Sequence, residues 1–288
     1  TYNVTIFVAQ DVVRPTLLRV VVDFSGGYLY LEADETIDVT LISLNDLTLT
    51  PHQGAAPTGC FIDPLSMCNG TVLAPTIDSK IVTIQMSEGV RVAAQYSTLR
   101  LGDDAPLFFN LNQNALVDIA GNGILQTLQF NTSEVHDISQ PHLITSIVHF
   151  GTRSMTLVFN ETLDLTPASI HVNLNKLLLS NDAITLNATT DIRMGGATVI
   201  EVDATTMYIE LTERQRVALL FQSAAQHREV DVDFAGDGTS LFTNVEEGFV
   251  VDLRGNPSVS QYGMSTQEID DLSVPFITSA ILYLETGR

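Results

Sequence analysis

The chain has 288 residues with 34 acidic and 13 basic side chains, so its formal net charge is −21. This shortage of basic residues excludes a nucleic-acid partner, because binding phosphates requires clustered Lys and Arg. Apolar residues make up 45% of the chain, but no run of them reaches the length of about 18 residues that a membrane-spanning helix needs. We therefore predict no membrane span.

A duplicated pattern divides the chain. Residues 15–38 align without a gap to residues 141–164, and the shared positions are Pro15/Pro141, Leu17/Leu143, Val22/Val148, Phe24/Phe150, Leu31/Leu157, Glu35/Glu161, Thr36/Thr162 and Asp38/Asp164. A repeat of about 130 residues has the length of a whole domain, and each copy is long enough to bury a core of its own. We therefore predict two domains, residues 15–140 and 141–274.

Partial copies flank these two domains. Residues 1–14 precede Pro15 as the end of the first domain precedes Pro141, so we predict that they are the terminal strand of a preceding repeat. Residues 275–288 begin like the second domain, since both stretches place a Thr-Ser pair shortly after a proline. We predict that they form the first strand of a further repeat.

Within each domain the sequence favours strands. In the first domain, two apolar runs flank Ser25-Gly-Gly27, which is a hairpin signal. Residues 82–86 and 207–211 alternate apolar with polar side chains, as a strand with one buried face does. About seven or eight short strands per repeat are typical of a β-sandwich. The predicted fold class is all-β, with two tandem sandwiches.

A helix is predicted directly after each alternating strand. Ser87 and Thr212 stand where an N-cap residue accepts hydrogen bonds from the first free N–H groups of a helix, and an acidic residue follows each of them. In the second helix we expect Val217, Leu220 and Phe221 to contact the core.

The two cysteines predict a local disulfide. Cys60 and Cys68 lie close together in a loop that contains Pro and Gly. Such a bond indicates an oxidising compartment and therefore an extracellular or cell-surface protein. Two free thiols in a cytosolic protein are the alternative. A zinc site would need further ligands that do not accompany this pair.

Asn-x-Ser/Thr sequons predict N-linked glycans if a glycosylating cell secretes the chain. Five of them are present, at Asn3, Asn69, Asn131, Asn160 and Asn187.

Two short motifs carry a family resemblance. The second domain has Leu157, Phe159, Glu161 and Asp164 early, and Asp252, Gly255 and Asn256 late. The first domain answers with Leu31, Glu35 and Asp38, then Asp118, Gly121 and Asn122, but it has Ala33 at the aromatic position. This pattern resembles the Ig-like repeats of S-layer proteins and other large cell-surface proteins. The resemblance implies a β-sandwich used as a spacer or assembly module, and it carries over no catalytic residue.

The late motif is also explained as a turn. Gly121 and Gly255 permit a positive φ, and Asp118 and Asp252 can accept hydrogen bonds from the N–H groups of the turn. Calcium is the alternative, although a single carboxylate beside carbonyl groups is an incomplete coordination shell. We therefore expect no cofactor, with calcium as the competing interpretation.

The sequence shows no nucleophile elbow, zinc-protease or phosphate-loop motif, and it has no Trp. We expect a protein that is not an enzyme. The favoured function is a structural subunit of an extracellular filament or surface layer, in which copies of the chain assemble head to tail, by strand donation from the partial repeats. The alternative is an adhesin ectodomain or ligand-binding surface module, whose loops bind a partner.

Overall fold

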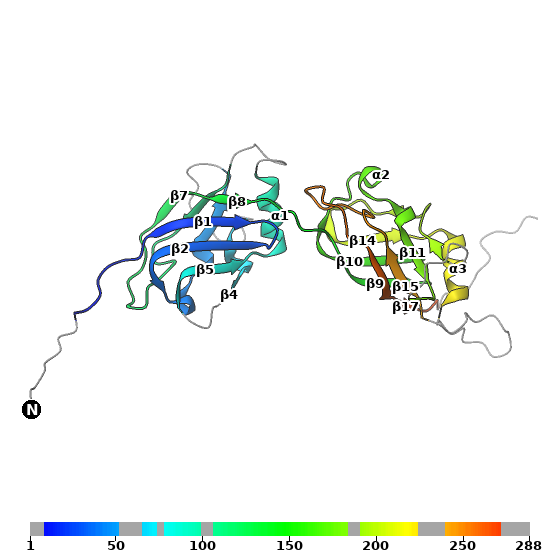
Figure 1. Cartoon of the computed structure of the whole chain (residues 1–288), viewed down its shortest axis with the longest axis horizontal. Coiled ribbons are helices and arrows are strands. Elements are labelled where there is room, and N and C mark those ends of the chain that lie inside the picture. Colours follow the sequence, from blue (N-terminus) through cyan, green and yellow to red (C-terminus); the bar gives the residue numbers. More distant parts are fainter. Residues whose placement is uncertain are drawn as a thin grey trace, which may run out of the picture. The chain divides into compact units, whose positions relative to one another are not determined.

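The computed structural model describes residues 9–51, 65–73, 78–98, 106–183, 191–223 and 240–271. The chain divides into two compact units, residues 1–139 and 140–288. Each unit is built mainly of strands (Figure 1), so the predicted all-β fold class is confirmed. The partial repeat expected at 275–288 lies outside the described residues, as do the first eight residues of the one expected at 1–14.

The first unit is a sandwich of two sheets. The strands are β1 (Leu17–Asp23), β2 (Tyr28–Ile37), β3 (Leu47–Thr50), β4 (Thr71–Leu73), β5 (Ser79–Gln85), β6 (Phe108–Leu111), β7 (Thr127–Asn131) and β8 (Ser133–Val135). One sheet has the order β4-β5-β2-β1-β8 and the other has the order β3-β6-β7. These orders match the D-E-B-A and C-F-G sheets of an immunoglobulin sandwich, with the end of the last strand crossing over to pair with the first.

The second unit repeats this topology. Its strands are β9 (Leu143–His149), β10 (Ser154–Leu163), β11 (Leu177–Ser180), β12 (Ile192–Arg193), β13 (Thr198–Val199), β14 (Ala204–Glu210), β15 (Phe242–Val245), β16 (Gln261–Ser265) and β17 (Gln267–Ile269). The sheet orders are β13-β14-β10-β9-β17 and β12-β11-β15-β16. In both units the last short strand pairs in parallel with the first, since β8 pairs with β1 and β17 pairs with β9.

Alternating side chains build each core. Val82, Ile84 and Met86 are buried in the first unit, and Met207, Ile209 and Leu211 are buried in the second, as the alternation predicts. The polar residues between them point away from the core, because successive side chains of a strand face opposite sides. β1 and β2 form the predicted hairpin around Ser25-Gly-Gly27.

The two predicted helices are present as α1 (Glu88–Tyr96) and α3 (Glu213–Gln222). Ser87 caps the first through the N–H of Val90, and Thr212 caps the second through the N–H of Gln215. The remaining helical turns are short: η1 (Val39–Leu41), η2 (Leu44–Asp46), η3 (Met67–Asn69), α2 (Ala168–His171) and η4 (Leu174–Lys176). None of the helices in the described ranges is long and apolar enough to cross a membrane.

The predicted core contacts of α3 were partly wrong. Phe221 is 57% exposed and Val217 is 37% exposed, whereas Leu219 is fully buried and Leu220 packs partly against the core. The buried stripe of this helix runs through Gln215 and Leu219, which are four residues apart and therefore share a face. Val217 and Phe221 lie half a turn away from that stripe and face solvent.

Candidate functional site

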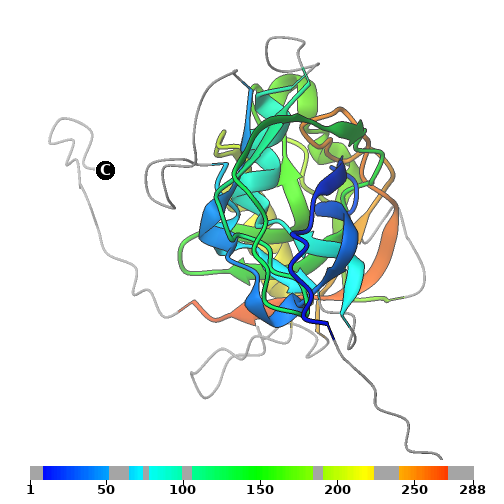
Figure 2. The same ribbon diagram turned by 90° about the vertical axis from the view of Figure 1, so that its left-hand side faces the viewer.

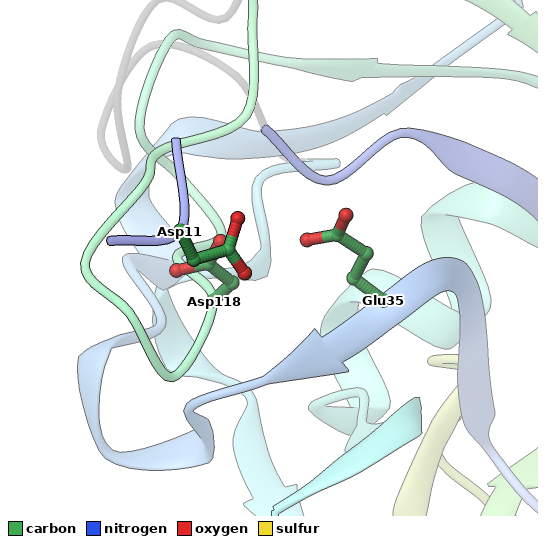
Figure 3. Close-up of side chains that lie close together, drawn as sticks. All are labelled: Asp11, Glu35 and Asp118. Atoms are coloured by element: carbon green, nitrogen blue, oxygen red, sulfur yellow. The ribbon is translucent and has the colours of Figure 1, made fainter. Parts of the chain in front are cut away.

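Three acidic side chains of the first unit converge. Asp11 comes from the segment before β1, Glu35 from β2, and Asp118 from the loop after β6, and Figure 3 shows their three carboxylates gathered in one place. One oxygen of each carboxylate lies within 4.8 Å of the others. Asp11 is exposed, Glu35 is half-buried and Asp118 is buried. Figure 2 views this unit from the side of its N-terminal segment.

A tight turn holds Asp118. Its Oδ1 accepts hydrogen bonds from the backbone N–H groups of Ala120 and Asn122, both at 2.8 Å, and its Oδ2 accepts one from Asn122 Nδ2 at 2.9 Å. Burial raises the pKa of Asp118, but the hydrogen bonds from Asn122, Ala120 and Gly121 outweigh it and hold the pKa below its usual value. Gly121 has a φ of 90°, so the turn predicted from the sequence is confirmed.

The pKa of Glu35 is shifted in the opposite direction from that of Asp118. Desolvation raises its pKa, and so do the negative charges of Asp11, Asp34 and Asp118, while Lys80 acts in the other direction. Carboxylate oxygens are ligands that calcium prefers. The group therefore offers more oxygen ligands than the single Asp118 on which the sequence-based calcium alternative rested.

The second unit contains the counterpart of two of these residues. Glu161 and Asp252 are both buried, and an oxygen of one lies within 4.8 Å of an oxygen of the other. Asp252 Oδ1 accepts hydrogen bonds from the N–H groups of Arg254 and Asn256, both at 2.8 Å, and Asn256 Nδ2 donates to its Oδ2 at 2.7 Å. Gly255 has a φ of 83°. The residues of the late motif thus have the same structural role in both units.

An ion pair fastens the end of each unit to its helix. In the first unit Arg91 of α1 contacts Asp137 at 2.5 Å and Glu88 at 2.7 Å. In the second unit Arg216 of α3 contacts Asp271 at 2.7 Å and Glu213 at 2.6 Å. We call this arrangement the exit clamp, because Asp137 and Asp271 follow the last strand of their units.

Sequence reasoning missed the exit clamp, although the signal is in the sequence. Arg91 and Arg216 stand three residues after the acidic residue that begins each helix. Asp137 and Asp271 both precede, by the same spacing, a proline at which a repeat begins, Pro141 or Pro275.

The predicted disulfide is not tested by the described residues. Cys68 belongs to η3, whereas Cys60 lies outside the described part of the chain. The bond between them stays a prediction.

The predicted glycosylation sites also stay predictions. Asn69, Asn131 and Asn160 are exposed, and Asn3 and Asn187 lie outside the described residues. Asn160 also has a structural role, because its Oδ1 accepts a hydrogen bond from the N–H of His142 at 2.7 Å. Asp34 accepts one from Thr16 in the same way at the start of the first unit.

Comparisons with known proteins show only distant likeness. No protein-family profile and no curated protein matches the chain. A crystal structure of the N-terminal part of the bacterial S-layer protein SbsC is 11% identical, with a TM-score of 0.27, and the match covers 70% of this chain and 45% of that one.

Immunoglobulin-type structures are similarly distant. The four N-terminal Ig domains of Dscam1 isoform 8.4 match at 8% identity with a TM-score of 0.21, over 91% of this chain and 52% of that one. A marsupial T cell receptor matches at 8% identity with a TM-score of 0.19, over 90% of this chain and 73% of that one. The chain thus spans about half the length of the first two structures. At these scores none of the three supports a statement about function, and the immunoglobulin-like topology rests on the strand order.

Proposed function

We propose that the chain is a structural subunit of an extracellular filament or surface layer, in which copies assemble head to tail. The observation that supports this proposal is the exit clamp, which recurs in both units on equivalent residues. A spacer built from tandem units needs a fixed path for the chain as it leaves each unit, and the clamp supplies one.

The chemistry of the clamp fits such a positioning role. The side chains of Arg91 and Asp137 are 6% and 1% exposed, and Gln95 of α1 donates a second hydrogen bond to the Asp137 carboxylate at 2.7 Å. Removing two charges from water is costly, so a buried ion pair adds little net stability, and its best-attested contribution is to fix one arrangement over others. Here it fixes Asp137, two residues after the end of β8, against α1.

Other features of the chain support an extracellular location. The acidic surface keeps a secreted chain soluble, and the predicted Cys60–Cys68 bond requires an oxidising compartment. N-linked glycans on the exposed sequons would be compatible with this location. An adhesin ectodomain is the competing function, because the same pair of sandwich units could also carry loops that bind a partner.

Negative-stain electron microscopy of the purified chain tests the proposal. We expect polymers with a regular axial repeat, and we expect the double variant Arg91→Ala with Arg216→Ala to give irregular or shorter ones. Arg153→Ala is the matched control, because Arg153 pairs with Glu210 at the surface at 3.6 Å and belongs to no clamp. A wild-type chain that stays monomeric and binds cells or glycans would support the adhesin function instead.

A further inference from the structure

A groove opens in the first unit along the seam where its first strand, β1, meets β7 of the other sheet. It has a volume of about 460 Å³ and is lined by residues 18–20 of β1, by all of β7 and by Ser133. The two strands belong to different sheets of the sandwich and are labelled in Figure 1. The groove therefore lies where the two sheets meet along their first and last strands.

Both walls of the groove are strand edges. On this side of β1, the described residues supply only β8 as a partner, and β8 pairs with Val21–Asp23 alone. β7 ends the order of its sheet. Leu18 is 56% exposed and Leu128 is 41% exposed, although both are large apolar residues. An edge with unpaired backbone groups and exposed apolar side chains is a template for another strand.

In the second unit a glutamine side chain bonds to the backbone of the first strand across the same seam. The carboxamide of Gln261, the first residue of β16, donates to the carbonyl oxygen of Leu143 at 3.0 Å and accepts from the N–H of the same residue. An amide that donates and accepts in this way takes the place of a neighbouring strand. The equivalent residue of the first unit is Thr127, the first residue of β7, whose hydroxyl donates to Leu125 instead. Threonine is too short to bridge the seam as glutamine does.

We propose that this groove of one copy accepts residues 274–284 of a second copy as an added β-strand. This inference rests on the proposed function and names the surface through which copies would join. Strand addition obtains affinity from main-chain hydrogen bonds and specificity from pockets for alternate side chains.

The sequence of residues 274–284 fits a strand donor. Its Pro275-Phe-Ile-Thr-Ser stretch resembles the start of the second unit, where residues 143–149 form β9. Its length is sufficient, because β7 has 5 residues and a strand of that length spans about 17 Å.

Charge also favours this occupant. The chain carries a net charge of −21, so two copies have the same sign of net charge and repel each other at long range. Residues 272–284 contain no charged side chain. The groove lining contains one charged residue, Arg19, which is positive. Docking this segment in this groove brings no two carboxylates together.

A fluorescent peptide of residues 273–288 tests the inference on the full chain of 288 residues. We expect saturable binding, measured by anisotropy, together with slower amide hydrogen exchange in residues 18–20 and 127–131. The variant Thr127→Gln supplies the side chain with which the second unit bridges its seam, and it should weaken binding by about tenfold or more. The control Thr83→Gln makes the same change on the outer face of β5 and should bind as wild type. Circular dichroism verifies that both variants fold.

Three results would overturn the inference: equal affinity of Thr127→Gln and Thr83→Gln, equal binding of a scrambled peptide, or protection from exchange only outside the groove. Electron microscopy of the same variants separates this inference from the proposed function. Polymers that form normally in Thr127→Gln leave the proposed function standing and reject the groove. Peptide binding in the groove of a chain that never polymerises supports the groove as an acceptor and rejects the filament.

Discussion

Apart from β12, which is described in the second unit alone, the two units have the same strand order, but they place different chemistry at the seam between their first and last strands. In the second unit a chain of buried hydroxyls, Ser146, Thr243 and Thr266, crosses the seam with contacts of 2.6 and 2.8 Å. The first unit has Val20 and Phe109 at the positions of Ser146 and Thr243, and Val20 lines its groove. The alternating core pattern therefore sets the topology of both units, while a few side chains decide whether a sheet edge is closed or available.

A β-bulge occurs at equivalent positions in the two units. Gln129 has a φ of 61° and Gly263 has a φ of 70° at matching positions of β7 and β16. The N–H of each donates to an asparagine side chain, Asn110 or Asn244, at 2.7 Å. The asparagine therefore maintains the bulge in both units, even where the residue is not glycine.

The largest loss of stability is expected when a charged residue is placed in the core of each unit in turn. Ile84→Asp and Ile209→Asp each place a carboxylate where the wild-type side chain is fully buried, and each should destabilise its own unit by about 4 kcal/mol or more. Calorimetry combined with limited proteolysis shows which unit unfolds. Tyr208→Asp, at the next position on the exposed face, should have little effect. Equal losses from Tyr208→Asp and Ile209→Asp would contradict the assigned faces of β14.

The exit clamps should differ in strength between the two units. Asp137→Asn breaks a buried pair and should destabilise the first unit by about 3 kcal/mol. Asp271→Asn breaks a pair whose side chains are 19% and 20% exposed, where solvent screens the charges, so a loss of about 1 kcal/mol is expected. Chemical denaturation measures both. If the two losses were equal, burial would not determine the strength of the clamp.

The predicted disulfide would be specific to the first unit, since both cysteines lie there. A bond between Cys60 and Cys68 should stabilise that unit by about 2 to 3 kcal/mol through the unfolded state. Reduction should therefore lower its melting temperature and leave the second unit unchanged. Intact-mass measurement after alkylation checks the bond itself, and two reactive thiols in the unreduced protein would refute it.

Substitutions at the bulge should change stability by less, and in opposite directions in the two units. Gln129→Gly removes a non-glycine residue from the left-handed region and should stabilise the first unit by about 1 kcal/mol. Gly263→Ala should destabilise the second, because an added Cβ would lie 2.6 Å from the carbonyl oxygen of Ala183. Thermal denaturation of both variants is the measurement. A Gln129→Gly variant that is less stable than wild type would mean that the glutamine side chain makes a contact worth more than the strain.

Local patterns predicted the parts of the fold that depend on local physics. The alternation of residues 82–86, the caps at Ser87 and Thr212, and the turns at Gly121 and Gly255 are each fixed by neighbours in the sequence. The acidic group of Asp11, Glu35 and Asp118 was not predicted, because it joins a segment before β1, a strand and a late loop. Only the tertiary fold brings these three together, and the same holds for the groove between β1 and β7.

The smallest effect concerns the acidic group, and its sign depends on pH. Desolvation and the charges of Asp11, Asp34 and Asp118 raise the pKa of Glu35 in the folded state, so the ionised carboxylate opposes folding above that pKa. Glu35→Gln should therefore raise the melting temperature of the first unit slightly at pH 7, in the presence of a chelator. As the pH falls below the ordinary glutamic-acid pKa of about 4.3, wild-type Glu35 becomes protonated in both states and the difference should disappear. Asp34 and Asp118 act oppositely, because their lowered pKa values add stability that is lost as the pH falls through them.

The variant Glu32→Gln is the control, because it also removes one negative charge from the same acidic unit. A Glu35→Gln effect that is the same at pH 7 and pH 4, or is matched by Glu32→Gln, would mean that the three carboxylates do not repel one another measurably.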